Sequence, residues 1–333
     1  MEADKIILGV KIMKLEDIGF YTLSDKRANN SSIKSPLWRC ELILNESCNF
    51  KCGYCRGIRK DIATQLGEGT FETLTYWIQD RLQNIRFSGG EPTLYRELPE
   101  LVALCKMHGV KRIAVSTNGS ADRSKYQELI DCGVNDFSVS LDACCSSGCD
   151  KMSGVENMWE KIIDNIRFIS SQTYCTVGVV IDNNNINNFK YIISLADSLG
   201  VSDIRIIPSA QFNETLKVAE NIPYSIIIKY PILKYRVDNI LAGRHVRGID
   251  SANHCKCWLA MDDMAVAGEY HFPCIIYMRE HGDPIGKVNY EMRQDRMAWI
   301  KSHNPYQDPI CSKNCLDVCV QYNKTCENYN DKP

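Results

Sequence analysis

Apolar and polar residues along 38–210 follow two spacings in turn, which predicts alternating strands and helices. Short apolar runs typical of buried strands recur at regular intervals. They lie at Arg39–Leu44, Asn84–Ser88, Arg112–Ser116, Asp136–Ser140, Tyr174–Ile181 and Asp203–Ile207. Apolar residues at helical spacing between these runs predict helices over 70–83, Leu98–Cys105, 121–132, 155–170 and 186–199.

A helix between successive strands requires parallel pairing with right-handed crossovers. The pattern therefore predicts an α/β fold with a parallel barrel, or part of one, of about six β/α units. In such folds the functional groups lie at the carboxyl ends of the strands. Ser88-Gly89-Gly90-Glu91-Pro92, Thr117-Asn118-Gly119 and Asp142 all follow predicted strands at that edge.

The β/α rhythm stops near residue 210. Residues 212–247 are expected to be mostly helical, with breaks at Pro223 and Pro231. Met264–Ala267 and Tyr270–Cys274 flank a Gly-Glu turn and predict a β-hairpin. Near the amino terminus, Ile6–Met13 predicts a strand. We divide the chain into an N-terminal extension (1–37), a (β/α)6 core (38–210) and a cysteine-rich hairpin and helix extension (211–333).

Composition narrows the class of protein. The chain has 333 residues, 44% of them hydrophobic, and a formal net charge of -2. This charge argues against a large nucleic-acid substrate. The sequence has no run of about 18 apolar residues, and its first residues do not resemble a secretory signal. We therefore expect a soluble, cytoplasmic protein that does not act at a membrane.

The chain has 17 cysteines, many more than a protein without an export signal needs for packing. Three of them, Cys48, Cys52 and Cys55, have C-x3-C-x2-C spacing directly after the first predicted strand. Thiolates suit iron–sulfur clusters and zinc. Structural zinc prefers four ligands, so three thiols fit an open, reactive metal better. A zinc knuckle is the alternative.

This cysteine loop, followed by Gly89-Gly90-Glu91-Pro92, resembles the radical SAM superfamily. The resemblance implies a partial (β/α)6 TIM-like barrel in which Cys48, Cys52 and Cys55 hold a 4Fe-4S cluster. It also implies that S-adenosylmethionine binds the open iron and is cleaved reductively to a 5′-deoxyadenosyl radical, which abstracts a substrate hydrogen. An electron donor such as flavodoxin or ferredoxin would be needed.

The resemblance also implies S-adenosylmethionine-binding residues. Glycines would let backbone approach the methionine moiety, Glu91 would accept a hydrogen bond from its ammonium group, and Tyr54 would lie near the adenine. The full set of candidates is Tyr54, Gly89, Gly90, Glu91, Ser116, Thr117, Asn118, Ser140 and Arg205. Ordinary loop capping is the alternative for the Ser, Thr and Asn residues, and a solvated or ion-paired role is the alternative for Arg205.

The carboxyl-terminal cysteines resemble the auxiliary-cluster extensions of this superfamily, called SPASM and twitch. Cys257, Gly268 and Cys274 match the first part approximately, with a glycine-to-cysteine gap one residue longer than usual. The predicted ligands of one auxiliary 4Fe-4S cluster are Cys257, Cys274, Cys315 and Cys319, with Cys311 as the next choice. Two clusters or a zinc site are alternatives.

Cys144, Cys145 and Cys149 follow the fourth strand. Cys144 or Cys145 would serve as a hydrogen donor to a substrate radical, which would make the enzyme an epimerase; the alternative is a loop with incidental cysteines.

These features favour a radical SAM enzyme that isomerises, epimerises or dehydrogenates a small or medium substrate in a natural-product or modified-nucleotide pathway. A maturase of ribosomally made peptides is an alternative, although no winged-helix recognition module is evident. A non-catalytic metal-binding regulator is another alternative, and so is methyl or aminocarboxypropyl transfer. Nothing in the sequence indicates the oligomeric state.

Overall fold

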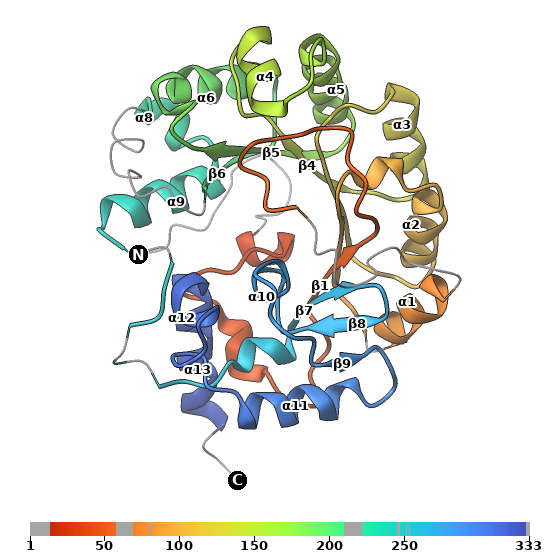
Figure 1. Cartoon of the computed structure of the whole chain (residues 1–333), viewed down its shortest axis with the longest axis vertical. Helices are drawn as coiled ribbons and strands as arrows, with labels where there is room; N and C mark the ends of the chain where they lie inside the picture. Colours follow the sequence, from red (N-terminus) through yellow and green to blue (C-terminus); the bar gives the residue numbers. More distant parts are fainter. Residues whose placement is uncertain are drawn as a thin grey trace.

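We describe a computed structural model of the chain over residues 14–57, 69–79, 81–209, 222–244, 247–250, 252 and 254–330. The predicted strand Ile6–Met13 lies outside these residues. A single nine-stranded sheet, in the order β6-β5-β4-β3-β2-β1-β7-β8-β9, forms the centre of the molecule. It curves around an interior with helices on its outer side (Figure 1).

The six predicted core strands are present and pair in parallel. They are β1 (Arg39–Ile43), β2 (Asn84–Ser88), β3 (Arg112–Thr117), β4 (Asp136–Ser140), β5 (Tyr174–Ile181) and β6 (Asp203–Pro208). Their outer helices are α1 (Thr70–Gln79), α2 (Leu98–Met107), α3 (Arg123–Cys132), α4 (Ser146–Ser153), α5 (Trp159–Gln172) and α6 (Phe189–Ser198). The prediction of an α/β fold with a partial (β/α)6 barrel is therefore confirmed.

The rest of the described chain is mostly helical apart from a hairpin. Its strands are β7 (Asp263–Ala267), β8 (Tyr270–Phe272) and β9 (Gly286–Lys287). Its helices are α8 (Tyr224–Ile227), α9 (Pro231–Leu241), α10 (Ile275–Arg279), α11 (Met292–Ser302), α12 (Cys311–Asn314) and α13 (Asp317–Asn330). Short 3₁₀ turns lie at Leu15–Ile18, Lys26–Asn30, Pro92–Leu94, Ile186–Asn188 and Trp258–Met261. No helix among the described residues has the length and apolar character needed to cross a bilayer.

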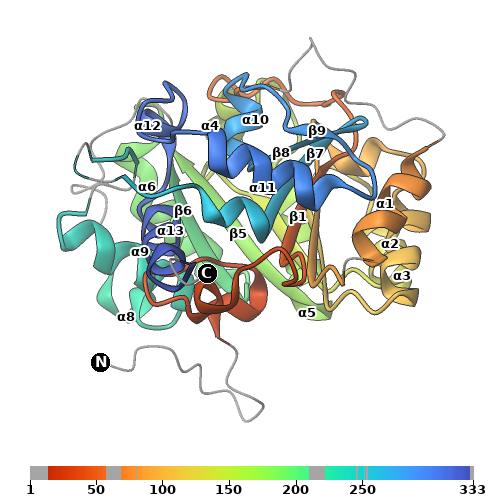
Figure 2. The same cartoon turned by 90° about the horizontal axis from the view of Figure 1, so that it is seen from below.

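The predicted hairpin forms, and it belongs to the same sheet as the core. β7 pairs in parallel with β1, from Arg39 opposite Asp263 to Ile43 opposite Ala267, and β8 returns antiparallel to β7. Figure 2 shows β7, β8 and α11 lying beside β1. The proposed boundary between core and extension stays a prediction, but the backbone hydrogen bonds run across it.

Two helix predictions were wrong in their limits. The helix predicted over 70–83 ends at Gln79, and Arg81 takes a left-handed φ of 60° that α-helix cannot continue. The helix predicted over 155–170 begins only at Trp159, and α4 precedes it. The cysteines and serines of α4 have no clear apolar periodicity, so the pattern gave no sign of this helix.

Strand residues alternate between an apolar outer face and a polar inner face. The outward side chains of Phe87, Val115, Phe137 and Ile204 are fully buried among the helices. Inward positions instead carry charged and hydroxyl groups, such as Glu41 in β1. Because side chains alternate along a strand, this places a polar interior inside the curved sheet.

A buried carboxylate joins β6 to α9. Asp203 is 0% exposed, and its oxygens accept the N–H groups of Ile232 at 3.0 and 3.1 Å and of Ile204 at 2.8 Å. Burial raises the pKa of this carboxyl to about 7, against an ordinary value of 3.8. Between pH 3.8 and about 7, Asp203 is therefore protonated in the folded protein but ionised in the unfolded chain.

We expect the free energy of unfolding to fall as the pH rises from about 4 to about 7, because the folded state binds the extra proton. The Asp203→Asn variant, which cannot ionise, should show a weaker fall over this window. Thermal unfolding midpoints at both ends of the window test this, with Asp164→Asn at an exposed site as the control. Equal slopes in the wild type and Asp203→Asn would contradict the expectation.

Candidate active site

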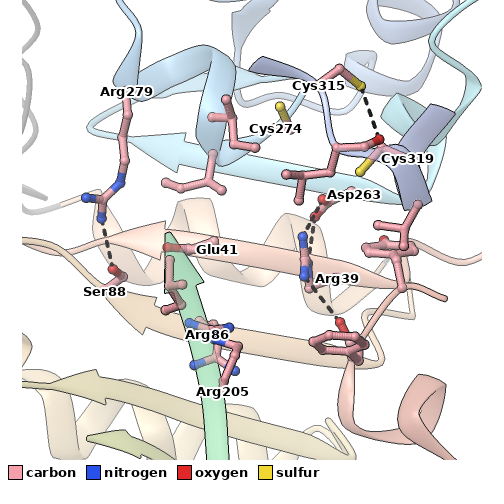
Figure 3. Close-up of a pocket in the computed structure, with 18 of the residues that line it drawn as sticks. Arg39, Glu41, Arg86, Ser88, Arg205, Asp263, Cys274, Arg279, Cys315 and Cys319 are labelled. Carbon is pink, nitrogen blue, oxygen red and sulfur yellow. Dashed lines mark hydrogen bonds and ion pairs between the residues drawn. The ribbon is translucent and has the colours of Figure 1, made fainter. Parts of the chain in front are cut away.

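A cavity of about 510 Å³ fills the interior of the curved sheet. The residues that line it include inward strand positions, the end of the first cysteine loop, the carboxyl-terminal cysteines, and side chains from the segment before β1, from α9 and from α10. Figure 3 shows guanidinium groups from β1, β2 and β6 at one side and the sulfurs of Cys274, Cys315 and Cys319 at the other. The volume is typical of small-molecule sites.

The first cysteine loop has the donor chemistry of a cluster site. The backbone N–H of Phe50 points to Cys48 Sγ at 3.4 Å, and that of Gly57 points to Cys55 Sγ at 3.3 Å. Burial raises the pKa of Cys52 to about 11, so an incoming metal must displace its proton. Three thiols, two of which accept a backbone N–H, fit a 4Fe-4S cluster, whose sulfurs accept such bonds.

The two glycines after β2 pack against the cysteine loop itself. A Cβ on Gly90 would lie 2.2 Å from the carbonyl oxygen of Ser47, and one on Gly89 would lie 2.7 Å from that of Asn45. The N–H of Gly90 donates to Asn45 O at 2.9 Å. Contact with backbone of the same chain is therefore sufficient to require glycine here, and the expected approach to the methionine moiety stays a prediction.

Gly90→Ala is expected to displace the cysteine loop, because the added methyl would overlap the Ser47 backbone. Overpacking of this kind costs about 1–3 kcal/mol of stability, and the displaced loop should lose cluster iron. Gly53→Ala is the matched control within the same loop, since its Cβ meets nothing within 4 Å. Iron content and thermal unfolding of both variants test this, and normal iron binding by Gly90→Ala would contradict it.

The Glu91 carboxylate is buried between the loops that follow β2 and β3. It is 1% exposed. Oε1 accepts hydrogen bonds from the hydroxyls of Thr93 and Thr117, each at 2.7 Å, and Oε2 accepts the N–H of Asn118 at 2.7 Å. Because these protein donors occupy its oxygens, the geometry favours a positioning role for Glu91 over the predicted direct bond to an ammonium group.

Asn118 and Asn49 connect the third strand to the cysteine loop. The side-chain amide of Asn118 donates to Asn49 Oδ1 at 2.8 Å and lies 4.0 Å from Cys48 Sγ. The loop after β3 is therefore held against the first cysteine, at the carboxyl edge of the sheet where both were expected.

The other predicted cofactor-binding residues divide into two groups. Tyr54, Ser116 and Arg205 line the cavity, whereas Ser140 is exposed and is not among its lining residues. The Tyr54 hydroxyl donates to the Asp142 carboxylate, and burial raises the pKa of that carboxyl to about 6. Tyr54 is thus anchored by Asp142, for which the sequence gave only its place after β4.

The predicted carboxyl-terminal ligands all lie at the cavity, and their role as cluster ligands stays a prediction. These five thiols are Cys257, Cys274, Cys311, Cys315 and Cys319. Burial raises the pKa of Cys257 to about 12. Such a set of half-buried thiols on one cavity fits an auxiliary 4Fe-4S cluster, which needs soft anionic ligands.

The remaining cysteines lie elsewhere. Cys326 is fully buried in an apolar cluster with Tyr21 and Val318, and its thiol donates to Ala28 O at 3.3 Å. Cys144 and Cys145 are not among the residues that line the cavity. The structure therefore does not bring the predicted hydrogen donors together with the other candidates.

Sequence reasoning missed most of the charged lining. Seven arginines line the cavity, at positions 39, 56, 86, 205, 236, 247 and 279, against the acidic residues Glu41, Asp136 and Asp263. Arg39 pairs with Asp263, Arg56 with Glu280 and Arg86 with Asp136. The signal available in the sequence was the presence of charged residues inside otherwise apolar strands, as in Arg39-Cys40-Glu41.

Three of these arginines keep an unpaired polar atom. Arg205 Nε, Arg236 Nε and Arg247 Nη1 are buried without a hydrogen-bond partner among the described residues. Burial, with repulsion from Arg86 and Arg236, lowers the pKa of Arg205 to about 10. Since a buried donor without a partner is costly, an anion that accepts hydrogen bonds from these nitrogens would suit this side of the cavity.

Comparison with known proteins agrees with the fold and the cysteine loop. Residues 42–196 match the model of the radical SAM superfamily. A probable GTP 3′,8-cyclase of Metallosphaera sedula is 25% identical over 52% of this chain and 56% of its own. A GTP 3′,8-cyclase of Staphylococcus carnosus is 31% identical over 53% of this chain and 51% of its own. The chain thus spans about half the length of these curated relatives.

Solved structures with a similar fold cover more of the chain. Streptococcus suis SuiB bound to the precursor peptide SuiA has a TM-score of 0.60 at 13% identity, over 88% of this chain and 77% of its own. Native anSMEcpe with bound AdoMet has a TM-score of 0.57 at 14% identity, over 89% of this chain and 97% of its own. At such low identity the likeness concerns the fold.

Proposed function

Because this chain belongs to the radical SAM superfamily, we propose that it is a radical SAM enzyme acting on a nucleotide or another phosphorylated small molecule. The observation that carries the proposal is the set of buried, unpaired guanidinium nitrogens in the cavity. Guanidinium groups bind phosphate oxygens through short, charge-assisted hydrogen bonds.

We assign the two proposed iron–sulfur clusters to different cysteines of the chain. When bound, a 4Fe-4S cluster and S-adenosylmethionine supply a 5′-deoxyadenosyl radical that removes hydrogen from C–H bonds. We assign this cluster to Cys48, Cys52 and Cys55, and an auxiliary cluster to the carboxyl-terminal cysteines. Cys55 and these cysteines line the same cavity, so a substrate there would lie between the two groups.

The residues of the cavity would then bind and orient the substrate. Arg205, Arg236 and Arg247 would bind its phosphates, and Ser116 would offer a hydroxyl to its polar edge. The sheet and the carboxyl-terminal helices would exclude water from the reacting atoms. An electron donor such as flavodoxin or ferredoxin stays a prediction.

GTP is the first candidate substrate, and an isomerisation is the first candidate reaction. The names of the curated relatives point to both, since these are GTP 3′,8-cyclases. A peptide substrate, as in SuiB with SuiA, has only similarity of fold in its favour. The arginine-lined cavity is better matched to a nucleoside triphosphate than to an extended peptide.

The test uses full-length protein reconstituted anaerobically with iron and sulfide. We expect GTP to accelerate the release of 5′-deoxyadenosine from S-adenosylmethionine in the presence of a reductant, followed by chromatography with mass detection. Release that no nucleoside triphosphate stimulates would refute the substrate while leaving the enzyme class intact. Formation of methylthioadenosine or S-adenosylhomocysteine would indicate group transfer instead.

A further inference from the structure

Five carboxyl-terminal thiols line the cavity, although a 4Fe-4S cluster takes four cysteines. Cys311 differs from the other four in its neighbours. Its Sγ lies 3.6 Å from Nε2 of His303, and the carboxylate of Asp308 is close to both. A histidine and a carboxylate beside a thiol are the donor set of a mononuclear metal site.

The three donor atoms have the spacing that a single ion requires. His303 Nε2, a carboxylate oxygen of Asp308 and Cys311 Sγ all lie within 4.8 Å of one another. A tetrahedral zinc ion bonds sulfur at about 2.3 Å and nitrogen at about 2.0 Å, which separates those two ligands by about 3.5 Å. The observed separation of sulfur and nitrogen agrees with this value.

Neighbouring residues hold the three side chains in place. The His303 ring stacks on Trp299 with centroids 4.0 Å apart and an angle of 16° between the planes. Asp308 Oδ1 accepts the N–H of Cys311 at 2.8 Å, and the Tyr277 hydroxyl donates to Oδ2 at 3.2 Å. Support of this kind around the ligands is typical of metal sites, because it fixes their orientation.

We propose that His303, Asp308 and Cys311 bind one divalent transition-metal ion, zinc in the first place, at a site distinct from the auxiliary cluster. Cys257, Cys274, Cys315 and Cys319 then remain for the cluster. Three protein ligands leave a fourth position open, as in catalytic zinc sites. Because Cys311 lines the cavity, an oxygen atom of the substrate would occupy that position.

The proposal depends on the auxiliary-cluster assignment at one point: Cys311 is given to zinc, and the other four thiols are given to the cluster. Iron and zinc are therefore measured separately, so that the two assignments can fail independently. Full-length protein is reconstituted anaerobically with iron and sulfide, equilibrated with Zn²⁺ and freed of excess metal. Zinc, iron and sulfide are counted per chain, and zinc-edge X-ray absorption reports the atoms around zinc. The variants are His303→Gln, Asp308→Asn and Cys311→Ser, with His254→Gln, a nearby exposed histidine, as the control.

We expect the wild type and His254→Gln to bind one zinc ion with a single sulfur neighbour. His303→Gln, Asp308→Asn and Cys311→Ser should each weaken zinc binding at least tenfold and keep the iron and sulfide content of the wild type. His303→Gln removes no thiol, so it tests the site even if Cys311→Ser fails to fold.

Three results would overturn the proposal. The first is a wild-type protein that binds no zinc. The second is bound zinc with four sulfur neighbours, because such zinc would occupy the cluster cysteines. The third is the loss of about four iron atoms per chain in Cys311→Ser, which would show that Cys311 is a cluster ligand. Zinc with a single sulfur neighbour in a protein that fails to bind iron would refute the cluster assignments and support this site.

Discussion

The Cys52→Ala variant is expected to release no 5′-deoxyadenosine. Cys52 is the middle thiol of the three in the first loop, and the backbone N–H of Cys55 bonds to its carbonyl at 3.0 Å. With two thiols left, the loop cannot hold three corners of a cluster, so the variant should lose about four iron atoms per chain and keep those of the auxiliary site.

The measurement is iron, sulfide and 5′-deoxyadenosine in the same anaerobic preparation. Cys132→Ala, at the end of α3, is the matched control, because it removes a partly exposed thiol that does not line the cavity. Continued release of 5′-deoxyadenosine by Cys52→Ala at the rate of the wild type would refute the assignment of this loop.

The second large effect is expected at Arg205. Arg205→Met should weaken GTP binding about tenfold to a hundredfold, since a hydrogen bond to a charged group contributes about 1.5–3 kcal/mol. Cleavage of S-adenosylmethionine in the absence of GTP should continue. The substitution also removes a buried cation whose Nε is unpaired, so the ligand-free protein should not lose stability.

Titration calorimetry with GTP and thermal unfolding separate these two effects. Arg167→Met serves as the control, because the Arg167 side chain is 58% exposed and pairs with Asp164 on the same helix. Unchanged GTP affinity in Arg205→Met would place the phosphates elsewhere. A large loss of stability would mean that Arg205 is structural rather than ligand-binding.

The predictable part of the fold came from local periodicity. β2, β4 and β5 have the predicted limits, and the hairpin of β7 and β8 lies where the Gly268-Glu269 turn indicated. Each of these elements depends on neighbouring residues in the chain. The pairing of β7 with β1 was not predicted, because it joins segments more than 200 residues apart and neither carries a signal for the other.

The candidate site shows the same division. The spacing of Cys48, Cys52 and Cys55 predicted the first set of thiols, because these three residues share one loop. The second set was predicted from the resemblance to auxiliary-cluster extensions, and both sets stay predictions as cluster ligands. Arg236 and Arg247 were not found, because their place at the cavity depends on how α9 packs on β6 and on the backbone bridge between Arg247 and Leu316. Glu91 was found, but the protein donors around it are visible only in three dimensions.

The parallel pairing of β1 with β7 has a consequence for any shortened form of the chain. Removal of residues 263–267 would turn β1 into an edge strand, with exposed N–H and C=O groups directly before the first cysteine loop. Such edges recruit strands from other molecules. Truncation before Asp263 should therefore yield insoluble aggregates rather than a smaller catalyst. Replacement of the carboxyl-terminal third by a different segment would succeed only if that segment supplied a strand to pair with β1.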